Sequence, residues 1–236
     1  VVASEEYAYA RSHTNPTKIY GVKLDDVGNT MAAYGKYGMN TVVDNFMVTK
    51  TSRLYNSNSS TPITDVESYE YTAPGSGFNY RLLKSVSKQN SGSSIAYYSK
   101  YTYAKEYTPA GSGDDMNNAI NFFNINNKNI IVESIQSFID GSTEKITGGN
   151  LNTFKPVTVG DIIIGGTTVS TFLPYKSYQF VNQAGVVSTS FAPSTISSGV
   201  FIWDNTNYVN TPSAIEQYNT RGIPQLITDN SRIPKT

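Results

Sequence analysis

The turn patterns of this chain constrain its fold more than any other feature of its sequence. Residues 218–223 place Tyr218 before Asn219, with Gly222 three positions after the asparagine. Asparagine and aspartate side chains accept hydrogen bonds from the backbone that follows them, and glycine adopts the positive φ that other residues resist. The layout therefore predicts a tight connection between two antiparallel strands, with Gly222 at positive φ.

Residues 24–29 repeat this layout with a leucine in place of the tyrosine. In this interpretation Leu24 ends a strand, Asp25 forms the turn, and Gly28 and Asn29 close it. We expect Gly28, like Gly222, to adopt a positive φ, so that alanine at either position destabilises the protein.

Strand patterns dominate the remaining sequence. Three segments carry two tyrosines two positions apart, at residues 7–9, 69–71 and 101–103. Because successive side chains of a strand point to opposite faces, both tyrosines of a pair lie on one face of a sheet. Ordinary sheet packing explains these pairs, since the ring packs while the hydroxyl keeps a polar partner. A sugar-binding aromatic platform is the alternative.

Glycine and asparagine positions predict where the strands turn. Residues 81–88 and 95–103 form the clearest long hairpin, and residues 162–169 form another around two glycines. Residues 36–56 are expected to form a strand, a loop and a strand. From Thr147 onward we expect a meander of short strands, separated at residues 148–149, 160–161, 165–166 and 184–185.

One helix is predicted, at residues 114–126, with Ser112 or Asp114 as its N-cap. Its apolar residues recur at helical spacing: Met116, Ala119, Ile120 and Phe123. A buried strand should follow at residues 130–139. No linker and no break in composition divides residues 1–236, so we expect a single continuous module that is mainly β, an antiparallel sheet or meander with one short helix near 114–126.

Composition limits the partners of the chain. Its 236 residues include 18 basic and 18 acidic ones, so electrostatic attraction to nucleic acid or to an anionic membrane is not expected. Cysteine is absent, which excludes disulfides and thiolate metal sites. No apolar run approaches the roughly 18 residues that cross a bilayer, and no signal peptide is visible at the start. The strand-like start and the turn unit near the end favour a piece of a longer protein.

Candidate catalytic groups are few. His13 is the only histidine, and its polar loop context is typical of a solvated turn residue, not of a catalytic or metal-binding imidazole. Glycosidase chemistry needs only two carboxylates, but nothing in the sequence selects a pair. We therefore predict no catalytic residue and no enzyme activity, with a hydrolase that uses an unrecognised carboxylate pair as an alternative.

Calcium, phosphate and sugar sites have equally little support. Residues 25–26 and 204–207 offer oxygen ligands, but neither matches a spaced calcium loop, and turn chemistry explains both. Residues 111–113 precede the predicted helix as a phosphate cradle does, but two aspartates at that helix start repel an anion. Trp203 lies beside apolar residues and is expected in the core. No cofactor and no metal ion is predicted.

The two turn units resemble the YD repeat of the RHS family, whose strands wind into large hollow β-shells. The order of several motifs is similar to a divergent branch of that family found in long secreted and surface proteins of Bacteroidota. These motifs are a Tyr-x-Tyr strand, a Leu-Leu-Lys strand, a second Tyr-x-Tyr strand, a helix, an Ile-Ile strand and a Thr-Gly-Gly segment, at residues 69–71, 82–84, 101–103, 116–123, 130–131 and 147–149. The chain departs from the family at Leu24, Asn219 and Ile223, and it lacks a dense tandem array.

The resemblance implies a structural role. The chain would be a wall segment of a large extracellular or cell-surface RHS-like shell that encloses or displays an effector or adhesive region. Its partners would be the remainder of its own longer chain and export or surface machinery, such as that of type IX secretion. A carbohydrate-binding adhesin module is the alternative.

Overall fold

The computed structural model describes residues 2–11, 19–25, 33–39, 45–55, 61–73, 81–164, 167–219 and 221–228. Over these residues the protein is mainly β, as the strand patterns predict, with one α-helix, α1 (Asp115–Ile125), and two short 3-10 turns, η1 (Ala104–Glu106) and η2 (Ser188–Ser190). The strands are β1 (Val2–Arg11), β2 (Ile19–Asp25), β3 (Ala33–Met39), β4 (Asn45–Tyr55), β5 (Ile63–Tyr71), β6 (Leu83–Asn90), β7 (Ala96–Tyr103), β8 (Ile131–Asp140), β9 (Thr143–Ile164), β10 (Thr167–Val187), β11 (Thr195–Ser197), β12 (Val200–Ile202), β13 (Val209–Tyr218) and β14 (Pro224–Thr228).

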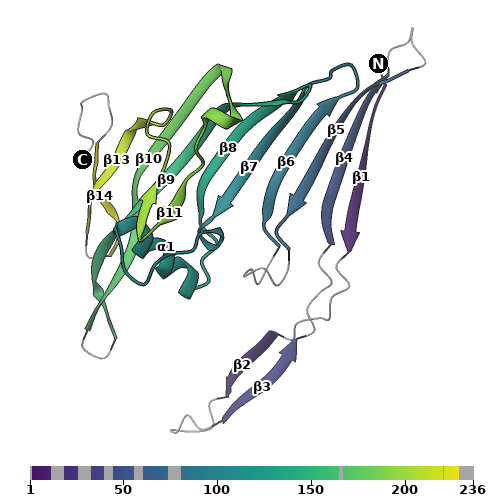
Figure 1. Cartoon of the computed structure of the whole chain (residues 1–236). Helices are drawn as coiled ribbons and strands as arrows, with labels where there is room; N and C mark the ends of the chain where they lie inside the picture. The colour runs from purple at the N-terminus through teal and green to yellow at the C-terminus, as the bar shows by residue number, and fades with distance from the viewer. Residues whose placement is uncertain are drawn as a thin grey trace.

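Ten of these strands form one open antiparallel sheet, in the order β1-β4-β5-β6-β7-β8-β9-β10-β13-β14 (Figure 1). Within the described residues, β1 pairs only with β4 and β14 only with β13, so both strands are edges of the sheet. Two small ribbons, β2–β3 and β11–β12, lie outside it. The sheet is a meander because most neighbours in space are also neighbours along the chain.

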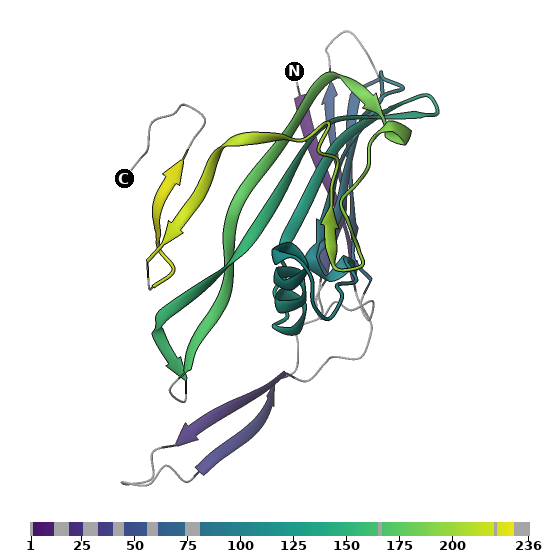
Figure 2. The same ribbon diagram turned by 60° about the vertical axis from the view of Figure 1, so that its left-hand side comes forward.

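The hydrophobic core lies on one face of the sheet, where α1 and the segment after β10 cover β8, β9 and β10 (Figure 2). Strand β8 shows the two faces clearly. Ile135 is buried on the core face, whereas its neighbour Gln136 is exposed on the opposite face. The alternation follows from strand geometry.

Helix α1 confirms the predicted helix and identifies its cap. Asp114, not Ser112, is the N-cap, and its Oδ1 accepts a hydrogen bond of 2.8 Å from the backbone N–H of Asn117. Its Oδ2 accepts another of 2.8 Å from the backbone N–H of Phe201 in β12. One carboxylate therefore starts the helix and ties it to the ribbon that packs against it. The four predicted apolar residues of α1 are all buried.

The hairpin prediction for residues 81–103 is confirmed by the pairing of β6 with β7, in which Gln89 lies opposite Ala96. The predicted strand at residues 130–139 is β8. The hairpin around residues 165–166 is supported by the pairing of Ile164 with Thr167, although both glycines lie outside the described residues. Residues 42–43 of the expected strand-loop-strand segment also lie outside them.

Three of the four strand breaks predicted after Thr147 are wrong. Residues 148–149 and 160–161 lie inside the single long strand β9, and residues 184–185 lie inside β10 (Figure 1). Packing, and not a turn, requires glycine at position 149, since a Cβ there would lie 2.5 Å from the Tyr208 hydroxyl oxygen. Gly185 has φ +75° at a register shift between β10 and β9, so it accommodates a bulge.

The part of the sheet formed by β1, β4, β5 and β6 has a different character. Strand β5 has paired neighbours on both sides, yet none of its residues is buried. The same is true of β6, and in β1 the described side chains are almost all exposed. This part is a single layer in the structure, because no described element covers either face of it. None of the described helices is long and apolar enough to cross a membrane.

Candidate functional site

The turn after β13 has the geometry that its sequence predicts. The Asn219 Oδ1 atom accepts hydrogen bonds of 2.9 Å from the backbone N–H groups of Arg221 and Ile223. The N–H of Gly222 donates to the Asn219 carbonyl at 2.9 Å, and Gly222 has φ +74°. The positive φ predicted for Gly222 is therefore confirmed. Tyr218 anchors the turn to the sheet, because its hydroxyl donates to the backbone carbonyl of Pro174 in β10.

The first predicted turn unit is described only in part. Leu24 and Asp25 end β2, where they pair with Tyr34 and Ala33 of β3 in an antiparallel ribbon. Gly28 and Asn29 lie outside the described residues, as do Asp26 and His13. The conformation of Gly28 stays a prediction.

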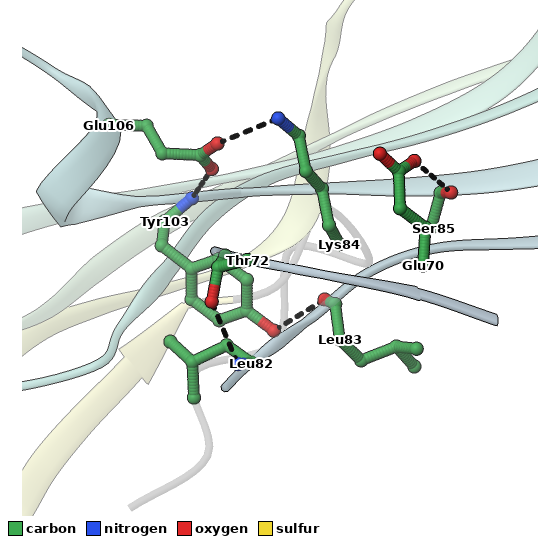
Figure 3. A network of polar contacts seen from close by, with 8 residues as sticks. All are labelled: Glu70, Thr72, Leu82, Leu83, Lys84, Ser85, Tyr103 and Glu106. Carbon is green, nitrogen blue, oxygen red and sulfur yellow. Dashed lines mark hydrogen bonds and ion pairs between the residues drawn. The ribbon is translucent and has the colours of Figure 1, made fainter. Parts of the chain in front are cut away.

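A polar network joins the ends of β5, β6 and β7 next to η1 (Figure 3). The Thr72 side chain accepts a hydrogen bond of 2.9 Å from the Leu82 N–H, and the Thr72 N–H donates to the Leu82 carbonyl at 2.8 Å. The buried Tyr103 donates its hydroxyl to the Leu83 carbonyl at 2.8 Å. One backbone bond and one bond to the threonine hydroxyl thus join Thr72 to Leu82 beyond the end of the ladder. The network therefore holds together the two ends of the connection between β5 and β6.

Glu106 of η1 completes this network (Figure 3). One of its oxygens accepts a hydrogen bond of 2.9 Å from the Tyr103 N–H, and the other lies 3.7 Å from the Lys84 ammonium. On the neighbouring strands, the Ser85 hydroxyl donates to Glu70 at 2.9 Å. The Glu106 contacts connect the η1 turn to β6 and β7, and the Glu70 contact connects β5 to β6.

The most deeply buried acid is Glu133 of β8, which is 0% exposed. Its Oε2 accepts hydrogen bonds from the backbone N–H and the hydroxyl of Ser194, at 2.9 and 2.6 Å. Its Oε1 accepts one from the Tyr208 hydroxyl at 2.9 Å. The Tyr107 hydroxyl lies 2.6 Å from the Ser194 Oγ. A buried carboxylate needs such donors because burial without them is costly.

Burial raises the pKa of the Tyr107 and Tyr208 phenols above the usual range, and the negative charge of Glu133 adds to the effect. Both tyrosines therefore stay protonated and keep their hydrogen bonds at neutral pH. The cluster fastens the segment after β10 to the sheet. Sequence reasoning missed it, although an acid beside Val132 in a predicted buried strand was an available signal.

Ser194 and Glu133 have residue types used in nucleophilic catalysis. A serine nucleophile is activated by an adjacent base that a third group orients. Here both carboxylate oxygens already accept hydrogen bonds, and the Ser194 hydroxyl is held between Glu133 and Tyr107. These contacts attach the segment after β10 to β8 of the sheet.

In the loop at residues 204–207, the Asp204 carboxylate accepts hydrogen bonds from the turn itself, as the turn interpretation predicts. The Asp204 Oδ1 accepts from the N–H groups of Thr206 and Asn207, at 3.2 and 3.0 Å. Its Oδ2 accepts from the Asn207 side chain and the Ala192 N–H, at 2.6 and 3.3 Å. Burial by itself raises the pKa of this carboxyl, but the hydrogen bonds from Asn207 and its neighbours lower it on balance. Among the described residues, no group of three metal-ligating side chains occurs.

Trp203 and the segment at residues 111–113 also have structural roles. The Trp203 ring lies against the core, 5.7 Å from Tyr178 and 5.9 Å from Phe201 between ring centroids. A Cβ on Gly113 would lie 2.0 Å from the Gly199 carbonyl oxygen. Glycine at position 113 therefore allows two backbones to cross closely.

A groove of about 310 Å³ lies at the bulge between β9 and β10. Its lining combines apolar side chains, such as Phe154 and Ile215, with polar ones, such as Asn152 and Ser177. Tyr175 also lines it, with the Lys155 and Lys176 ammonium groups 4.7 and 4.8 Å from its ring centroid. The two ammonium groups occupy the space near this ring that a stacked ligand needs.

No protein-family model, curated protein or solved structure matches the chain.

Proposed function

We propose that this chain is a structural, non-catalytic segment in the wall of a larger extracellular β-shell of the RHS type. The observation that carries the proposal is the single-layered part of the sheet. Strand β5 lies between two paired strands and still has no buried residue. Stable domains bury a sheet face against a second layer. This part of the sheet is therefore suited to be covered by a second layer, or extended by further strands, from another part of a larger protein.

The contacts between these strands support the same conclusion. Apart from the backbone ladder, ion pairs on the surface connect β1 and β4, with Lys50 3.0 Å from Glu5 and Arg53 2.9 Å from Glu6. Exposed ion pairs contribute little to stability because water and salt screen them. The strands β1, β4, β5 and β6 therefore depend more on their surroundings than β8 to β10 do.

The two edges of the sheet also fit a wall segment. Strand β1 presents a row of backbone groups along ten residues, and β14 does so along five. Unpaired edges of this kind accept another strand. The neutral, cysteine-free composition is compatible with export and a location outside the cell, and export or surface machinery such as that of type IX secretion belongs to this proposal.

Hydrogen exchange followed by mass spectrometry tests the proposal, with the 236-residue chain alone and within the complete protein that contains it. In the chain alone we expect slow exchange in β8, β9 and β10 and much faster exchange in β1, β4 and β5. In the complete protein, β1, β4 and β5 should become protected. A monomeric chain in which β1 to β5 are protected as strongly as β8 to β10 contradicts the proposal.

A glycan-binding module is the second candidate function. On the face of the sheet opposite the core, β7 to β10 place the uncharged polar side chains of Tyr101, Ser134, Asn150 and Gln179 in register, which favours it.

A further inference from the structure

The face of the sheet opposite the core carries a continuous row of uncharged polar side chains. Register pairs Tyr101 of β7 with Ser134 of β8, Ser134 with Asn150 of β9, and Asn150 with Gln179 of β10. Residues paired in this way have neighbouring side chains on the same face of the sheet. Four adjacent strands therefore place two carboxamides, a hydroxyl and a phenol side by side.

This row lies away from the core. The residues that alternate with it, such as Ile135 and Phe180, are buried on the other face, whereas Asn150 and Gln179 are exposed. The next row on the open face begins with Gln136, whose Oε1 lies 3.1 Å from the position of a Cβ on Gly148. Because Gly148 has no side chain, it leaves room for the Gln136 carboxamide beside β9. We call Tyr101, Ser134, Gln136, Asn150 and Gln179 the amide row.

An exposed aromatic residue borders the amide row. Tyr97 of β7 is 57% exposed, and its ring centroid lies 6.3 Å from that of Phe138, its register partner in β8. Tyr97 and Tyr101 are four positions apart on one strand, so their side chains share the open face. The Lys145 ammonium lies 5.8 Å from the Phe138 ring centroid, so Tyr97 is the ring of this pair that is open to a ligand next to the row of carboxamides.

We propose that the amide row and Tyr97 form a binding site for a neutral oligosaccharide chain. Carboxamides both donate and accept hydrogen bonds, as sugar hydroxyls do, and an aromatic ring offers an apolar surface to the C–H groups of a sugar ring. None of the five described side chains of the amide row is charged at pH 7, which matches an uncharged ligand. An acidic polysaccharide or a nucleic acid requires several cations along its length, and the amide row holds none. Two lysines of the open face lie beside the aromatic pair: Lys88 is the register partner of Tyr97 and lies 3.6 Å from the Glu67 carboxylate, and Lys145 is the register partner of Phe138. The alginate gel tests whether these lysines attract an acidic polymer.

The shape of the site also favours an extended chain. Four strands spaced about 4.8 Å apart present the row over roughly 14 Å, with exposed side chains and no enclosing wall among the described residues. A small ligand buries most of its surface in a concave pocket. A polymer that lies across the strands instead collects several weak contacts along its length. The inference rests on the glycan-binding candidate and not on the wall-segment proposal, so failure of the binding test leaves the wall-segment proposal to its own hydrogen-exchange test.

Affinity gel electrophoresis of the whole chain tests the site, with gels that contain β-glucan, mannan, xylan or dextran and one gel that contains alginate as an acidic polymer. We expect retardation by at least one neutral polysaccharide and none by alginate. The double variant Asn150→Ala/Gln179→Ala should bind the retarding polysaccharide at least about tenfold more weakly, because it removes two hydrogen-bonding groups. Tyr97→Ala should also weaken binding.

Gln89→Ala is the matched control, since it removes an exposed carboxamide from β6 on the other face of the sheet. Binding should be unchanged in this variant. Thermal melting of each variant shows that the fold is intact, which is expected because Asn150 and Gln179 are exposed. The proposal is overturned if no neutral polysaccharide retards the chain or if the double variant binds as tightly as the wild type. It is also overturned if gel filtration shows that the double variant differs from the wild type in self-association and not in polysaccharide binding.

Discussion

Replacing Tyr208 by phenylalanine tests whether the buried carboxylate of Glu133 depends on its surrounding donors. The substitution keeps the ring, which packs against Phe180 and Phe191, and removes only the hydroxyl. The Glu133 Oε1 atom then loses its donor at 2.9 Å in a position where the side chain is 0% exposed to water. Among the described residues, no ion pair compensates the carboxylate.

The expected loss follows from the charge of the acceptor. A hydrogen bond to a charged group contributes about 1.5–3 kcal/mol, because the buried ion otherwise stays without solvation. For a chain of this size, each kcal/mol shifts the melting temperature by roughly 2–4 °C. A loss of about 2 kcal/mol therefore lowers the melting temperature by about 4–8 °C.

Thermal unfolding monitored by near-UV circular dichroism provides the measurement. Tyr97→Phe is the control, because it removes a phenol hydroxyl from a residue that is 57% exposed, and surface changes are usually within about 0.5 kcal/mol. A double-mutant cycle with Ser194→Ala should show coupling, since both residues donate to the same carboxylate. If Tyr208→Phe lowers the melting temperature no more than the control does, Glu133 does not need this donor and the reasoning is wrong.

Three further outcomes are expected. Gly222→Ala should destabilise the protein by more than about 1 kcal/mol in urea unfolding, because Gly222 has φ +74°. The control Gly111→Ala should have little effect, since no atom lies within 4 Å of the new Cβ. Equal losses of stability in the two variants would refute the turn argument. Asp114→Ala should cost about 1–2 kcal/mol, since one carboxylate caps α1 and holds β12, and a cost near zero would show that water replaces both bonds. Stability should fall as the pH rises above about 10, the pKa of an unfolded tyrosine. The raised pKa values of Tyr107 and Tyr208 keep these phenols protonated in the folded state, while the unfolded chain loses protons. The double variant with phenylalanine at both positions should show a shallower decline of the urea midpoint with pH, and a decline as steep as that of the wild type would contradict this assignment.

Local patterns in the sequence determined the elements of this protein. The helix near residues 114–126 and the hairpin of β6 and β7 depend on side chains close together in the chain, so spacing alone predicts them. Spacing left both Ser112 and Asp114 open as the cap of this helix, and the structure selects Asp114. The turn at Gly222 is predictable for the same reason, because Asn219 bonds to the backbone that follows it within four residues. These interactions require no knowledge of distant segments.

The tertiary structure alone decided features that depend on segments far apart in the sequence. Gly148 and Gly149 resemble a turn, but β9 continues through them because both residues pair in register with β8 and β10. Their missing side chains leave room for Gln136 and Tyr208. The Glu133 cluster joins residues 61 and 75 positions apart, and no local pattern encodes such contacts. The amide row is likewise invisible in sequence, since its members lie on four strands and only register brings them together. Local hydrogen bonding thus sets the type of each element, whereas long-range packing and strand register set its length and the surface it presents.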